Sequence, residues 1–209
     1  RCAATPAGHA RRGRAHASSA LSASTLSLAC VVVFIAGIVR GFAGFGFSAL
    51  CVAGLSLLLP PTQVVPPVFV LEVLASVTLL RSAWRDADWR WLAWLVAGNV
   101  LFIPLGVATL AYLPETPLRL VIGALLLAAA LLLRRGVALG LAPTRGVRVA
   151  TGIVSGYVNG LAAIGGIAVA VIMSTAQMAP AAMRATLIVL FLFTDLYALV
   201  CAALLGTSD

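Results

Sequence analysis

Three ionisable side chains lie inside long apolar runs of this 209-residue sequence: Arg40, Glu72 and Asp195. A charge surrounded by hydrocarbon is costly, so an ionisable residue in such a run is a functional candidate by default. The planar guanidinium of Arg40 can form two parallel hydrogen bonds to an oxyanion, or it can pair with Glu72 or Asp195 and hold helices together. Either carboxyl group can carry a proton or make an ordinary polar contact. These residues therefore predict an anion site with two candidates for proton coupling.

Glycines surround Arg40 in the stretch "GIVRGFAGFGF", residues 37–47. Glycine clusters of this density weaken a helix and permit unusual backbone angles. An unwound backbone at membrane depth is tolerated only where it is buried in protein or lines a water-filled cavity. The stretch therefore predicts a broken helix. A half-helix that restarts near Phe47 would direct its N-terminal N–H groups at the membrane midplane, which suits an anion.

A second stretch, "GIVSGYVNGLAAIGG" at 152–166, repeats the pattern, and a Pro-containing turn and another apolar helix follow both stretches. We expect one four-segment unit over 26–135 and the opening half of a second over 147–209. An even number of crossings would separate the two units, which predicts parallel repeats. The pairs Gly37–Gly41 and Gly152–Gly156 have the small-xxx-small spacing, and close helix packing in lipid is the alternative role for them.

The candidate substrate-binding residues combine the arginine with the glycines of both breaks and with nearby hydrogen-bond donors. They are Arg40, Gly41, Gly44, Gly46, Ser48, Ser155, Asn159, Gly160, Gly165 and Gly166. Serine and asparagine also serve as ordinary contacts between membrane helices. Both histidines lie in the head, and no metal-ligand cluster or nucleophile–base set can be assembled, so we expect neither catalysis nor a metal or cofactor. No nucleotide-binding motif is present.

The composition excludes an ordinary water-soluble domain, because 62% of the residues are hydrophobic and the mean hydropathy is +1.11. Apolar runs long enough to span a bilayer recur, which predicts an all-α polytopic membrane protein embedded in the lipid bilayer. Six transmembrane segments are expected, at 26–59, 64–80, 92–113, 118–133, 147–173 and 187–205. The sequence begins with Arg and stops directly after an apolar segment, so we expect a fragment with a truncated second unit.

The charge of +8 comes from 14 arginines that cluster between the apolar runs, which is typical of topology signals and not of nucleic-acid binding. If each segment crosses once, the arginines of the head (1–25) and of the loops after the second and fourth segments fall on one side. The positive-inside rule then places a disordered head in the cytoplasm, with the protein in the inner membrane. The same pattern favours one broken crossing over 26–59, because a re-entrant hairpin would move the later loops to the other side.

Three stretches together resemble the sulfite exporter TauE/SafE family of membrane transporters. They are "GIVRGFAGFGFSAL", "GIVSGYVNGLAAIGGIAVA" and "AGNVLFIPLGVATLAYLPETPLRLVIGALLLAAALLL" at 97–133. The resemblance implies two repeats of about four helices each and transport of small sulfur-containing anions such as sulfite or organosulfonates. The chain departs from the family by stopping after its sixth segment. Asn159 and the extra residues before Gly165 also argue against a symmetrical site.

We therefore expect a secondary transporter that moves a small anion, sulfite or an organosulfonate, with coupling to protons through Glu72 or Asp195. The alternative is a helical membrane subunit without transport activity, in which the glycines only pack helices. A continuous helix through Gly41–Gly46 would favour that alternative.

Overall fold

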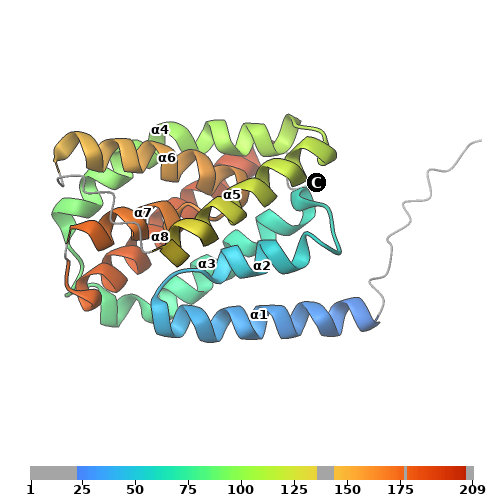
Figure 1. The fold of residues 1–209 in the computed structure, drawn as a ribbon, viewed down its shortest axis with the longest axis horizontal. Helices are drawn as coiled ribbons and strands as arrows, with labels where there is room; N and C mark the ends of the chain where they lie inside the picture. The colour runs from blue at the N-terminus through green and yellow to red at the C-terminus, as the bar shows by residue number, and fades with distance from the viewer. Residues whose placement is uncertain (1–22, 136–143, 177, 206–209) are drawn as a thin grey trace, which may run out of the picture.

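The computed structural model describes residues 23–135, 144–176 and 178–205, and these residues form eight helices and no strand. Most helix axes run along the long dimension of the molecule (Figure 1). The helices are α1 (Ala23–Ala43), α2 (Phe47–Leu55), α3 (Pro61–Ala83), α4 (Trp89–Tyr112), α5 (Glu115–Arg135), α6 (Arg145–Ala162), α7 (Gly166–Thr175) and α8 (Pro180–Leu204). The prediction of an all-α polytopic membrane protein is confirmed. The predicted head lies almost wholly outside the described residues.

Five of the described helices are long and apolar enough to cross a membrane: α1, α3, α4, α5 and α8. The predicted segments 26–59 and 147–173 each divide into two helices, because the backbone breaks where the glycines cluster. In the second break the left-handed residue is Ala163, with φ of 58°, whereas Gly165 has an ordinary φ of −57°. The two breaks therefore have different backbone geometry.

The first break reverses the chain. Gly44 and Gly46 have φ values of 79° and 90°, a region that glycine enters without steric cost. The short helix α2 then folds back along α1, so that Gly46 faces Val39 and Gly54 faces Val32 (Figure 1). The prediction of one broken crossing over 26–59 is wrong, because two left-handed residues turn the backbone around where a simple interruption would let it continue.

Helices α4 and α6 make the closest packing in the bundle. A Cβ atom on Gly152 would lie 2.5 Å from the carbonyl oxygen of Leu95, and one on Gly156 would lie 2.7 Å from the Cα atom of Asn99. The contacts advance in the same direction along both helices, so α4 and α6 are parallel. The second small-xxx-small pair thus lets two backbones touch. At the corresponding Gly37, no other helix in the described part of the chain lies within 4 Å of the position that a Cβ would take.

Two hydrogen bonds place the end of α1 beside the starts of α4 and α8. Arg184, in the first turns of α8, donates to the carbonyl of Gly41 at 2.8 Å. The N–H of Asp88, which caps α4, donates to the hydroxyl of Thr186 at 2.9 Å. Helix α1 ends where α4 begins, so α1 and α4 run in opposite directions. Because α6 is parallel to α4, the helix set α6–α7–α8 runs opposite to the helix set α1–α2–α3. The expected parallel orientation is therefore wrong, since the reversal at the first break adds one crossing.

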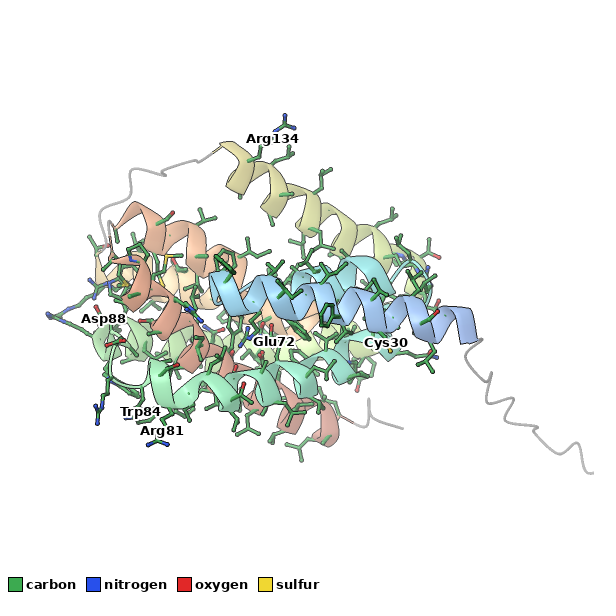
Figure 2. All side chains as sticks on the ribbon, turned by 90° about the horizontal axis from the view of Figure 1, so that it is seen from below. Cys30, Glu72, Arg81, Trp84, Asp88 and Arg134 are labelled. Atoms are coloured by element: carbon green, nitrogen blue, oxygen red, sulfur yellow. The ribbon has the colours of Figure 1, made fainter. Side chains whose placement is uncertain are left out.

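The reversal also removes the basis for a cytoplasmic head. Arg81, Trp84 and Asp88 lie together at one end of the bundle, away from Cys30 near the start of α1 (Figure 2). Arg148 of α6 lies at that same end, with its guanidinium 4.5 Å from the ring centroid of Trp91. The arginines between α3 and α4 and at the start of α6 therefore gather on the side opposite the start of α1. The positive-inside rule can no longer place these arginines and the predicted head on one side.

Candidate functional site

The site begins with Arg40, which lies one turn before the end of α1. Its Nη1 atom is 2.5 Å from Oε2 of Glu72, and its Nη2 atom donates a 2.6 Å hydrogen bond to the hydroxyl of Ser76. Arg40 and Glu72 are 1% and 0% exposed, and Glu72 lies near the centre of the bundle (Figure 2). Helix α3 supplies both partners because residues four apart share one helix face. The pairing that the sequence left open for Arg40 is therefore with Glu72.

The second oxygen of Glu72 contacts the start of α2. Its Oε1 atom accepts a 3.2 Å hydrogen bond from the backbone N–H of Ser48, in the first turn of that helix. A helix N-terminus has free N–H groups and a partial positive charge, and an arginine beside it adds a full charge. The Glu72 carboxylate thus occupies a small anion-binding arrangement made by α1 and α2.

A second polar cluster joins α6, α7 and α8. The side-chain amide of Asn159 donates to Oδ1 of Asp195 at 2.7 Å, and its carbonyl oxygen accepts from the N–H of Gly165 at 3.3 Å. Asp195 is 1% exposed, and its Oδ2 atom has no hydrogen-bond partner among the described residues. Asn159 therefore ties the break before α7 to a buried carboxyl group.

Phe191 contacts both Arg40 and Gly166, and the sequence reasoning did not include it. The Arg40 guanidinium lies 5.1 Å from the centroid of its ring, within cation–π range. The tip of the ring touches Gly166, and a Cβ added at that glycine would overlap it. The signal in the sequence was its position one helical turn before Asp195.

The remaining predicted residues make other contacts. Gly160 packs on α4, where an added Cβ would overlap the carbonyl oxygen of Ile103. The Ser155 hydroxyl makes a long 3.5 Å hydrogen bond to Asn99, and Ser155 lies against Gly165 of the second cluster. The first-break glycines Gly41 and Gly44 lie against Arg184. The structure thus brings Arg40, Ser48 and Glu72 together in one cluster, and Ser155, Asn159, Gly165 and Asp195 together in another.

The chemistry of the assembled side chains is that of charge and hydrogen bonding. Among the described residues, no group of three His, Cys, Asp or Glu side chains could hold a metal ion. The TauE family model, described as Sulfite exporter TauE/SafE, matches residues 29–209. The chain belongs to the sulfite exporter TauE/SafE family. The resemblance inferred from the glycine-rich stretches is confirmed.

This TauE/SafE protein is thus a member of a membrane transporter family whose description implies export of sulfite or a related anion. The match covers both breaks and every residue of the two polar clusters. No curated protein and no solved structure matched the chain in the corresponding comparisons.

Proposed function

We propose that this protein is a secondary transporter that moves a small oxyanion, sulfite or an organosulfonate, together with a proton. The observation that carries the proposal is the position of Glu72, whose carboxylate is held by the Arg40 guanidinium and by the N–H of Ser48. These two donors are suited to a sulfite or sulfonate group as much as to a carboxylate. The break at 44–46 supports this function over a subunit that only packs helices.

Proton coupling follows from competition for these donors. A protonated Glu72 loses its charge and its ion pair, so Arg40 and the Ser48 N–H are released for an incoming anion. When the anion leaves, Glu72 gives up its proton and takes back both donors. The anion and the proton therefore bind together and move in the same direction. Asp195, with one unpartnered oxygen, is the second candidate proton carrier.

The two helix sets, α1–α3 and α6–α8, run in opposite directions, and this arrangement supports transport by alternating access. Transporters with inverted repeats expose a central site to one side and then the other by rocking one repeat against its partner. Arg40 and Glu72 are buried in this structure, so movement of α1–α3 against α6–α8 must open the path. We propose that the end of the bundle rich in arginine faces the cytoplasm, across an inner membrane. Its arginines are Arg81, Arg85, Arg90, Arg145, Arg148 and Arg184.

Transport into proteoliposomes tests the proposal. Labelled methanesulfonate is a suitable probe beside sulfite, because it has no neutral form that diffuses through lipid. An imposed pH gradient should drive accumulation on the alkaline side, with protein-free liposomes as the blank. Arg40→Ala should slow uptake roughly 10- to 100-fold, which corresponds to the loss of a charged hydrogen-bond donor. Glu72→Gln should retain anion exchange and lose the response to the gradient.

The matched control is Arg119→Ala, because Arg119 is an exposed arginine whose ion pair with Glu115 is 4.0 Å long. It should transport like the wild type. Uptake by Arg40→Ala equal to that of this control would contradict an anion site at Arg40. Absence of uptake of either anion by the wild type, with or without a gradient, would reject the substrate class.

A further inference from the structure

The ring of Phe191 contacts Arg40 of the first polar cluster and Gly166, which follows Gly165 of the second cluster. It is 2% exposed, and the Arg40 guanidinium, which is held by Glu72 and Ser76, lies over it. The tip of the ring contacts Gly166 at the first position of α7. A larger residue than glycine does not fit there while the ring keeps this position.

Phe191 and Glu72 have corresponding places in the two opposed helix sets. Glu72 lies eleven residues after Pro61, which begins α3, and Phe191 lies eleven residues after Pro180, which begins α8. Each side chain covers the start of the short helix that precedes its own long helix. Glu72 does so by accepting the N–H of Ser48, whereas Phe191 does so by filling the space beside Gly166. Glu72 therefore interacts with the start of α2 electrostatically, whereas Phe191 packs sterically against the start of α7.

We propose that Phe191 is the gate and size filter of the site, an inference that rests on the anion transport proposed above. An anion held by Arg40 reaches the Asn159–Asp195 cluster only when the ring turns away from Gly166. The volume of the side chain at position 191 therefore limits the size of the organic group bonded to the sulfur atom of a sulfonate. Phe191 contacts the binding arginine directly, so its replacement changes selectivity between substrates.

Competition between anions of increasing size is the test. Uptake of sulfite, methanesulfonate and butanesulfonate is measured in proteoliposomes for the wild type and for Phe191→Leu. The smaller residue should raise the butanesulfonate-to-sulfite rate ratio by roughly tenfold, the lower end of the effect of one methylene group in a hydrophobic pocket. Phe193→Leu is the matched control, because Phe193 lies on the same helix and is 44% exposed. It should leave the ratio unchanged.

The outcomes separate the gate from the transport function. An unchanged ratio for Phe191→Leu, in a wild-type protein that transports sulfite, would overturn the gate and leave the transporter intact. A wild type that transports no anion would overturn both. Should Phe191→Leu not fold, Phe191→Met decides, because Met is also smaller than Phe and its flexible chain fills irregular gaps in a core. Loss of size selection in that variant is the expected result, and unchanged selection would refute the gate.

Discussion

Replacing Glu72 by glutamine should reveal whether its carboxylate occupies an anion site. Glutamine keeps the shape and can still accept the N–H of Ser48, but it leaves the charge of Arg40 buried without a partner. Breaking a buried ion pair in this way costs about 3–5 kcal/mol. In a protein of this size one kcal/mol corresponds to roughly 2–4 °C in Tm, so Glu72→Gln should lower Tm by on the order of 10 °C.

An added anion should restore part of this loss. If methanesulfonate binds the unpaired Arg40, a concentration one hundred times its Kd adds about 2.7 kcal/mol of stability. The wild type should gain much less, because Glu72 competes for the same donors. The assay is thermal unfolding of both proteins in detergent, with sodium methanesulfonate compared against sodium chloride at equal ionic strength.

Glu115→Gln is the control for the removal of a carboxylate. The side chain of Glu115 is 59% exposed, and its ion pair with Arg119 is solvated, so its removal should change stability by less than about 1 kcal/mol. Equal Tm values for Glu72→Gln and this control would refute the role assigned to the buried pair. Equal stabilisation of Glu72→Gln by chloride and methanesulfonate would refute an oxyanion site.

Two further predictions concern the bundle. Gly156→Ala should destabilise the protein by about 1–3 kcal/mol, because the new Cβ meets the backbone of α4. Gly37→Ala is the control: its Cβ enters open space, so its stability in the same unfolding assay should differ from that of the wild type by less than about 0.5 kcal/mol. Cysteines introduced at Arg85 and Arg145 should react with an impermeant maleimide from the cytoplasmic side, and one at Ser24 near the start of α1 from the opposite side. Labelling of the cysteines at 24 and 85 from the same side would contradict the chain reversal.

The membrane-spanning helices and the charged residues of the site were predictable from the sequence. Long apolar runs leave no polar surface for water, and an arginine or a carboxyl group inside such a run is conspicuous in one dimension. The partners of these groups were harder to predict. Ser76 and Phe191 are ordinary residues for a membrane helix, and only the packing of α3 and α8 brings them to Arg40.

The role of each glycine could not be predicted from its spacing. The pairs Gly37–Gly41 and Gly152–Gly156 have the same pattern, yet an α4 backbone faces only the second pair. A glycine permits close approach, but a neighbouring helix must be present for the approach to occur. Likewise, Ala163 adopts the left-handed conformation in the second break although glycines follow it closely.

The sequence by itself determined that this is a helical membrane protein of the TauE/SafE family, with breaks in two helices and a buried arginine beside the first. Composition and local backbone freedom are properties of the chain alone, so they need no tertiary contacts. The tertiary structure decided that the first break reverses the chain, that the two helix sets are opposed, and that Glu72 pairs with Arg40. A glycine-rich segment can continue or turn back, and only the packing of α2 along α1 selects between these two conformations.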